Sequence, residues 1–201
     1  MPCIKKAGVL GAGVMGATIA AHLANAGLDV VLLDIVPREL TEEEKKNGLS
    51  LESPQVRNRV AQNGLDGLLK IKPAPLLQKE YAKRIQIGNF ADHAHLLTEC
   101  DWVIEVVVEN MDIKKKMFSE TVGPNMKGGA ILSTNTSGLS VNEMATALPA
   151  EVRKNFMVTH FFNPPRYMRL MEVVGCKDAD PEKVNFMAEF INKRLGKGIV
   201  F

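Results

Sequence analysis

A glycine pattern near the N-terminus constrains the fold of this chain more than any other feature. A short apolar run ending at Leu10 predicts a strand, and G-x-G-x-x-G follows at residues 11–16. An alanine-rich segment then runs to Gly27, which is typical of a helix that ends at a glycine. Strand, glycine turn and helix in this order are the context in which the pattern predicts dinucleotide binding.

Each glycine has a physical role in such a turn. Gly11 permits the tight turn, Gly13 lets the backbone approach a pyrophosphate, and Gly16 lets helix and strand pack closely. The free N–H groups and the dipole at the helix start favour an anion. The candidate cofactor-binding residues of this loop are therefore Gly11, Ala12, Gly13, Val14, Met15 and Gly16.

A carboxylate after the second expected strand indicates which dinucleotide binds. Residues 28–34 predict a buried strand that ends at Asp34, close to the spacing of about 20 residues expected for a ribose-binding acid. A carboxylate there accepts hydrogen bonds from the ribose hydroxyls and repels a 2′-phosphate, so we expect NAD rather than NADP. Arg38 keeps NADP open, because a nearby arginine can receive that phosphate. A chance glycine turn is the other alternative.

Composition sets broad limits on the protein. The chain has 201 residues, 46% of them hydrophobic and 24% charged, which fits one large globular domain or one domain with a fragment of another. The net charge of +2 gives no electrostatic argument for nucleic acid or a membrane surface. The three cysteines show no paired spacing, which indicates a reducing compartment and no metal framework. With no signal peptide and no membrane-spanning run visible, we expect a cytoplasmic protein.

The rest of the chain alternates expected strands and helices. Strands are expected at residues 85–88, 101–109 (where Glu105 interrupts the apolar run), 129–135, 155–162, 170–175 and from 198 onward. Helices are expected at residues 37–46 and 91–100, from a cap at Asp112 to about 121, after a capping box at residues 140–143, and from Asp180 to Gly196. This alternation predicts an α/β, Rossmann-type doubly wound, mostly parallel sheet, with a helical excursion around residues 48–84. The basic residues of the excursion fit either solvated helices or a surface for a phosphate-bearing substrate.

Ligands of doubly wound sheets bind outside the carboxyl ends of the strands. That edge is expected to collect Gly11, Asp34, Glu109, Asn135, Ser137 and His160. His160 ends one strand and Glu172 lies on the next, so on neighbouring strands the carboxylate would orient the imidazole and stabilise its protonated form. Beside NAD such a pair suits alcohol oxidation, with Ser137 binding the reacting oxygen. A core histidine paired for stability is the alternative.

Four motifs in order resemble the NAD-binding domain of L-3-hydroxyacyl-CoA dehydrogenases. They are GAGVMG at 11–16, EVVVEN at 105–110, STNTS at 133–137 and HFFNP at 160–164. The resemblance covers nearly the whole chain and is weakest across 48–84. It implies that His160 is the catalytic base, Glu172 its partner and Ser137 a ligand of the substrate's C3 oxygen. It further implies contacts with NAD, or with the substrate beside it, from Glu109, Lys114, Ser137 and Asn163.

The resemblance also implies a reaction and a missing part. The reaction is reversible oxidation of an L-3-hydroxyacyl-CoA to the 3-ketoacyl-CoA, a step of fatty-acid β-oxidation or its reversal. Family enzymes continue into a helical C-terminal domain that closes the acyl cleft, supplies an asparagine and makes the dimer contact. We therefore expect residues 1–201 to be an NAD-binding domain with little turnover alone. The alternatives are a dehydrogenase of another hydroxy acid, such as a sugar acid, or a non-catalytic nucleotide-binding module of a larger multifunctional protein.

Two histidines in the predicted helix at residues 91–100 show no partner at metal-ligand spacing. His93 and His95 alternate with alanine, and no carboxylate or cysteine lies where a shared metal would require one. We therefore expect both to be surface histidines and expect no metal site.

Overall fold

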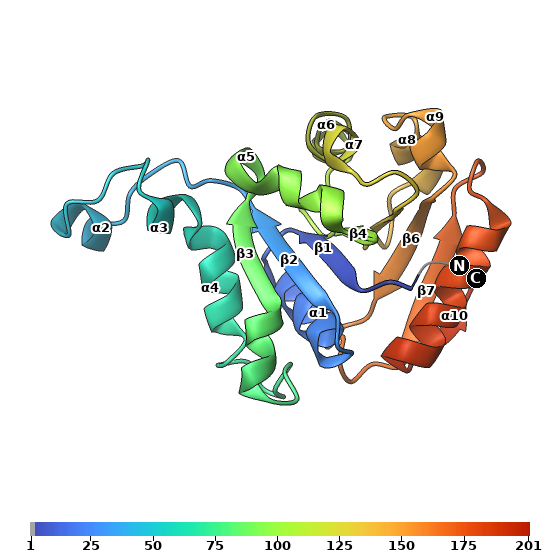
Figure 1. The fold of residues 1–201 in the computed structure, drawn as a ribbon, viewed down its shortest axis with the longest axis horizontal. Coiled ribbons are helices and arrows are strands. Elements are labelled where there is room, and N and C mark those ends of the chain that lie inside the picture. Colours follow the sequence, from blue (N-terminus) through green and yellow to red (C-terminus); the bar gives the residue numbers. More distant parts are fainter. Residues whose placement is uncertain (1–2) are drawn as a thin grey trace.

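The computed structural model describes residues 3–201, in which the strands form one twisted sheet covered by helices on both faces (Figure 1). The strands are β1 (Lys6–Leu10), β2 (Asp29–Asp34), β3 (Ile85–Asn89), β4 (Trp102–Glu105), β5 (Ile131–Thr134), β6 (Phe156–Phe161), β7 (Leu170–Gly175) and β8 (Gly198–Val200). Their order is β3-β2-β1-β4-β5-β6-β7-β8, and only the β6–β7 pair is antiparallel. The predicted doubly wound, mostly parallel sheet is confirmed.

The helices are mostly short. They are α1 (Val14–Asn25), α2 (Glu42–Lys46), α3 (Pro54–Arg57), α4 (Arg59–Gly67), α5 (Phe90–His93), α6 (Met111–Met117), α7 (Gly123–Asn125), α8 (Val141–Ala145), α9 (Ala150–Arg153) and α10 (Pro181–Leu195). Two 3₁₀ turns, η1 (Lys79–Arg84) and η2 (Ala94–Glu99), and a π-helical turn, η3 (Phe118–Val122), complete them. In the described part of the chain, no helix has the length and apolar character needed to cross a membrane.

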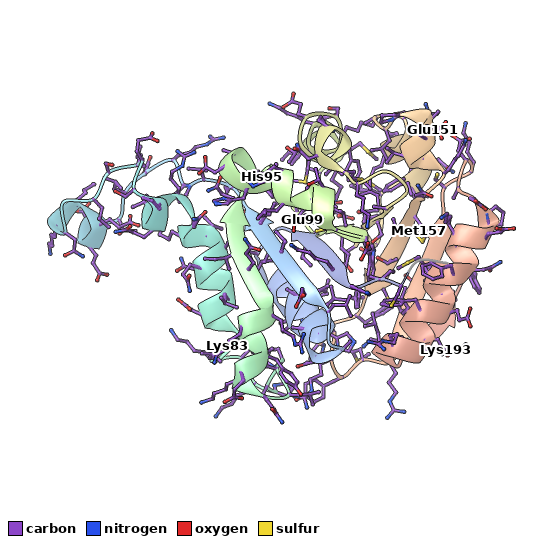
Figure 2. All side chains as sticks on the ribbon, viewed as in Figure 1. Lys83, His95, Glu99, Glu151, Met157 and Lys193 are labelled. Carbon is purple, nitrogen blue, oxygen red and sulfur yellow. The ribbon has the colours of Figure 1, made fainter. Side chains whose placement is uncertain are left out.

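Two hydrophobic cores hold the layers together, one on each face of the sheet. On the α1 and α10 face, the Trp102 ring stacks on Phe161 at 6.5 Å. On the α6 and α8 face, the Phe118 and Phe156 rings meet edge to face at 5.4 Å. Met157 is fully buried, whereas the labelled charged side chains of Figure 2 lie on the outside of the fold. Burial on both faces explains why the central strands are almost continuously apolar.

Several expected element ends are wrong, and local side-chain bonds explain them. Pro37 does not open a helix: α2 starts only at Glu42, because Thr41 and Glu44 form a reciprocal capping box. The strand expected at 101–109 ends at Glu105, whose carboxylate accepts a hydrogen bond from the Val107 N–H at 2.7 Å and turns the chain out of the sheet.

The N-cap of the helix after β4 lies two residues earlier than expected. Asn110, not Asp112, is the N-cap, and its side chain accepts from the Ile113 N–H at 3.0 Å. The box expected at 140–143 is only half formed: Ser140 caps α8, but the Glu143 carboxylate pairs with Lys115 at 2.9 Å. The segment at 91–100 is divided between α5 and η2. By contrast, α10 starts at its Asp180 cap and ends at Gly196 with a φ of 66°, as expected.

The excursion leaves the body of the fold and returns to it. Figure 1 shows α2 and α3 extending away from the sheet, while α4 comes back beside β3. Arg57 of α3 is held by two 2.7 Å hydrogen bonds to Asp92 of α5. A Cβ placed on Gly64 of α4 would lie 2.4 Å from the carbonyl oxygen of Ala12. The excursion therefore packs backbone to backbone against the glycine loop.

Candidate functional site

The glycine loop between β1 and α1 has a conformation that side chains would prevent. Gly11 has a φ of 109°, and a Cβ there would lie 2.6 Å from the Val106 carbonyl oxygen. A Cβ on Gly16 would lie 1.8 Å from the Gly11 carbonyl oxygen, so the close packing predicted for this position is present. Nothing lies within 4 Å of a Cβ on Gly13, which borders open space. The loop thus offers exposed backbone at the start of α1 for an anion.

Asp34 lies beside this loop at the carboxyl end of β2. One carboxylate oxygen accepts from the Ala12 N–H at 2.5 Å and the other from the Ile35 N–H at 2.6 Å. A groove of about 620 Å³ runs past the carboxylate, a size typical of small-molecule sites. It is lined by Gly11, Gly13, Asp34, Arg38, Val106 and Lys116, among others. Because Arg38 borders the same groove, the geometry leaves the sequence-based NADP alternative in place.

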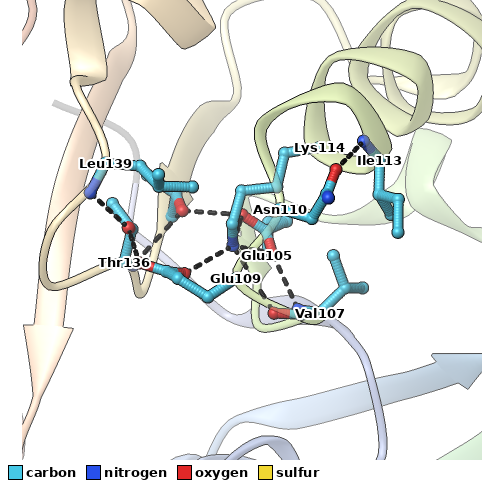
Figure 3. A network of polar contacts seen from close by, with 9 residues as sticks. Glu105, Val107, Glu109, Asn110, Ile113, Lys114, Thr136 and Leu139 are labelled. Atoms are coloured by element: carbon cyan, nitrogen blue, oxygen red, sulfur yellow. Dashed lines mark hydrogen bonds and ion pairs between the residues drawn. The ribbon is translucent and has the colours of Figure 1, made fainter.

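A buried ion pair supports the next part of the edge. Glu105 and Lys114 have side chains that are 0% and 1% exposed, and the Lys114 ammonium donates to both Glu105 oxygens at 2.7 and 2.9 Å (Figure 3). The Thr134 hydroxyl also donates to Glu105, at 2.6 Å. With the Val107 N–H, the buried carboxylate therefore has three kinds of donor, as a desolvated charge requires.

Glu109 extends this network toward solvent. One of its oxygens lies 3.4 Å from the Lys114 ammonium, and the other accepts from the Thr136 hydroxyl (Figure 3). Partial burial raises the pKa of Glu109, but the Thr136 hydroxyl and the Lys114 charge more than offset this and hold it below its usual value. Glu109 is therefore ionised at neutral pH. Sequence reasoning did not include Glu105 or Thr136 in the site, and a carboxylate inside an apolar strand was the available signal for Glu105.

The antiparallel β6–β7 pair brings His160 and Glu172 together. The two residues are directly opposite in the register, and Nδ1 of His160 lies 2.9 Å from a Glu172 carboxylate oxygen. The side chains are 17% and 44% exposed, so the pair opens to solvent, unlike Glu105 and Lys114. The Phe162 ring packs 4.6 Å from the imidazole. With Nδ1 on the carboxylate, Nε2 is the ring nitrogen that can exchange a proton with a ligand.

The other expected residues lie at the same end of the sheet. Ser137 and Asn163 are exposed in the loops that follow β5 and β6. Asn135 makes a structural contact instead. Its side-chain oxygen accepts from the Phe161 N–H at 2.8 Å and links the end of β5 to β6 beside His160.

The two histidines expected on the surface differ. His95 is exposed, whereas His93 is partly buried and its Nδ1 accepts from the Asn89 N–H at 3.2 Å, which corrects that expectation. Across residues 3–201, no three or more histidine, cysteine, aspartate or glutamate side chains gather in a way that could hold a metal ion.

Known proteins share this sequence and fold. A probable 3-hydroxyacyl-CoA dehydrogenase of Bacillus subtilis (strain 168) is 51% identical over 197 residues, covering 98% of this chain and 25% of that protein. A probable 3-hydroxyacyl-CoA dehydrogenase of Deinococcus radiodurans is 40% identical, covering 98% of this chain and 53% of that protein. The crystal structure of 3-hydroxybutyryl-CoA dehydrogenase from Escherichia coli K12 has a TM-score of 0.73 and 26% identity, covering 99% of this chain and 38% of that one.

The segment that matches a known family contains the residues at the carboxyl edge of the sheet. The chain spans about a quarter to a half of the length of these curated relatives. Residues 6–201 match the family described as 3-hydroxyacyl-CoA dehydrogenase, NAD binding domain, and so include the glycine loop, Asp34 and the His160–Glu172 pair. The chain therefore belongs to the family of 3-hydroxyacyl-CoA dehydrogenase NAD-binding domains.

Proposed function

We propose that this chain is the cofactor-binding part of an enzyme that oxidises an L-3-hydroxyacyl-CoA to the 3-ketoacyl-CoA, in fatty-acid β-oxidation or its reversal. The observation that supports this best is the 2.9 Å contact between His160 and Glu172 at the same sheet edge as the glycine loop. A proton acceptor beside a nicotinamide site is what alcohol oxidation requires.

The loop and groove fit a dinucleotide. The backbone at Gly13 is unobstructed, and the N–H groups at the start of α1 can bind the pyrophosphate. Asp34 uses each oxygen for only one backbone N–H, so lone pairs remain for the ribose hydroxyls. When bound, NAD accepts the hydride that leaves the substrate. Lys114 is buried against Glu105 and lies 3.4 Å from the partly exposed Glu109, so its proposed link to the cofactor runs through the Glu109 carboxylate.

The remaining roles belong to side chains at the carboxyl ends of β5 to β7. Nε2 of His160 takes the hydroxyl proton, and the Glu172 carboxylate holds the ring and stabilises the imidazolium. Ser137 donates a hydrogen bond to the C3 oxygen of the substrate, and Asn163 and Glu109 contact the ligands beside it. These assignments rest on the position of each residue at one edge and on its match to the family motifs.

The whole enzyme needs more than this chain. Because the chain spans a fraction of its relatives' length, we propose that residues 1–201 form the NAD-binding domain and that a helical domain of the same protein closes the acyl cleft and supplies the dimer contact. The three cysteines are unpaired, Cys3 on the surface and Cys100 and Cys176 inside. Unpaired cysteines are usual in a reducing compartment, and we propose a cytoplasmic location on that ground.

The proposal is tested by NADH oxidation with acetoacetyl-CoA in the protein that carries this chain, beside a panel of 3-keto acids and keto sugar acids without CoA. We expect turnover with the CoA thioester and little with the others. Turnover restricted to a free acid would overturn the proposal. Cofactor choice is tested separately by fluorescence titration: NADH should bind at least tenfold more tightly than NADPH, because Asp34 repels the 2′-phosphate. Equal binding of the two cofactors, or tighter binding of NADPH, would indicate that Arg38 receives the 2′-phosphate.

A further inference from the structure

Lys197 is a buried cation in the turn between α10 and β8. It follows the helix-ending Gly196 of α10 and is 2% exposed. Its carbonyl oxygen accepts from the Asn192 side chain at 2.8 Å, which fixes the backbone from which the side chain starts. Within residues 3–201, no carboxylate forms an ion pair with its ammonium.

The ammonium is instead bonded to backbone carbonyls of the β6–β7 loop, residues 162–169. It donates to the carbonyl oxygen of Pro165 and, at 2.6 Å, to that of Met168. Loop carbonyls have no partners in a strand ladder, and buried ones require donors. A lysine supplies three N–H donors on one atom, so it can satisfy two carbonyls from a single position.

The same loop is held from the opposite side by the end of the excursion. Arg166 donates to the carbonyl oxygens of Ala74 and Leu76 at 2.7 and 3.2 Å, and the Tyr167 hydroxyl donates to Ala74 at 3.0 Å. Two anchors therefore clamp the loop: Lys197, between α10 and β8, and the carbonyls of residues 74–76.

Keeping the Lys197 ammonium charged inside the fold costs free energy. Burial lowers the pKa of Lys197 to about 8, so the group is still an ammonium at neutral pH. Lys197 and Arg166 in the loop both act on the imidazole of His22 on α1, and neither Arg166 nor His22 can offset the Lys197 charge. An apolar side chain would fill the space without this penalty, so the hydrogen bonds to the loop are what the lysine contributes.

We propose that Lys197 is a positioning residue: by clamping the β6–β7 loop it sets the place of Asn163 and keeps His160 and Glu172 in register at the mouth of the site. The loop joins the two strands that carry the pair, and Asn163 lies within it. This inference rests on the proposed function for its effect on turnover, but not for its effect on the loop.

The test compares Lys197→Met with Lys193→Met in the protein that carries this chain. Lys193 lies on the same helix with its side chain 68% exposed, on the outside of the fold (Figure 2), and makes a matched control. Hydrogen exchange read by mass spectrometry follows the Tyr167 and Met168 amides, which both donate to the Pro164 carbonyl at 3.0 Å. Steady-state kinetics with the hydroxyacyl-CoA and NADH titration follow the site.

We expect Lys197→Met to raise exchange at these amides at least tenfold and to lower kcat at least tenfold, with a much smaller loss of NADH affinity. Lys193→Met should change none of these. Wild-type exchange and kcat in a folded Lys197→Met protein would overturn the proposal, and so would equal losses of kcat and NADH affinity. If Lys197→Met does not fold, Lys197→Gln is used: its amide carries N–H donors on an arm one atom shorter, so exchange should rise and kcat should fall by less than tenfold, and no change in either would overturn the proposal. A wild-type protein without turnover would refute the proposed function, while the exchange result would still decide the role of Lys197 in the loop.

Discussion

Two acid–base pairs at the same edge of the sheet differ in what surrounds them. Glu105 and Lys114 are sealed inside the fold, and every oxygen of the carboxylate is occupied. His160 and Glu172 are bonded at a similar distance but remain partly exposed, with one imidazole nitrogen left over. A buried pair whose bonds are all used serves structure, because it has no proton to exchange with a ligand. A pair that opens onto the cleft can serve chemistry.

The largest effect is expected on turnover, when the His160–Glu172 pair is broken. His160→Ala in the protein that carries this chain should lower the rate of 3-hydroxyacyl-CoA oxidation by about a hundredfold to ten-thousandfold, the usual contribution of a general base. NADH affinity should remain within about twofold, because the glycine loop and groove are untouched. Steady-state assays and fluorescence titration measure the two quantities. Near-normal turnover would remove His160 as the base and leave the pair a structural one.

Breaking the Glu105–Lys114 pair should instead lower the free energy of unfolding. Lys114→Met should lower the free energy of unfolding of this chain by about 3–5 kcal/mol, because it leaves the Glu105 charge buried without its partner. Lys116→Met is the matched control on the same helix, with a side chain 72% exposed. Replacing both members of the pair by methionine should recover part of the loss. Urea denaturation gives the values, and a loss under about 1 kcal/mol would contradict a structural role.

His22 is a further buried titratable group, and unlike Glu105 it has no hydrogen-bonding side chain as a partner. Neither ring nitrogen of His22 has a hydrogen-bond partner of good geometry, and burial together with the charges of Lys197 and Arg166 lowers the pKa of His22 to about 4. The unfolded state, with a pKa near 6.5, binds more protons between these values. Stability from this group should therefore fall by about 3 kcal/mol as the pH drops from 6.5 to 4.

The variant His22→Leu tests this pH dependence. It should be more stable than wild type at low pH and show a flatter dependence on pH in urea denaturation. His95→Leu, at an exposed position, should follow the wild-type curve. An unchanged slope in His22→Leu would assign the acid sensitivity to other groups.

The smallest effect should come from Glu172→Gln. Because the Glu172 side chain is 44% exposed, its pairing with His160 should contribute at most about 1 kcal/mol to stability. Turnover should nevertheless fall at least tenfold, since a neutral amide does not stabilise the imidazolium. Thermal denaturation and kinetics on the same preparation compare the two losses. A large loss of stability with normal turnover would place this pair in the same class as Glu105 and Lys114.

The sequence was sufficient for the sheet and for one half of the site. The glycine spacing, Asp34 and the strand–helix alternation are local patterns, and His160 and Glu172 lie on consecutive strands joined by one short loop. Their meeting follows once those strands are neighbours.

The parts that were missed depend on competition between side chains or on contacts between distant residues. Asn110 and Asp112 are both good caps, and the structure uses Asn110. The bonds of Glu105 to Thr134 and of Lys197 to Pro165 join residues far apart in the chain. A lysine after a helix C-terminus is ordinarily solvated, so no local pattern indicates that Lys197 is buried.

The contact between Gly64 and Ala12 has a mechanical consequence. The Gly64 backbone packs there on the Ala12 backbone and on its methyl group, which leaves no flexible side chain to absorb a shift. Any shift of the glycine turn at Ala12 would therefore press directly on α4, the helix that follows the projecting arm of α2 and α3.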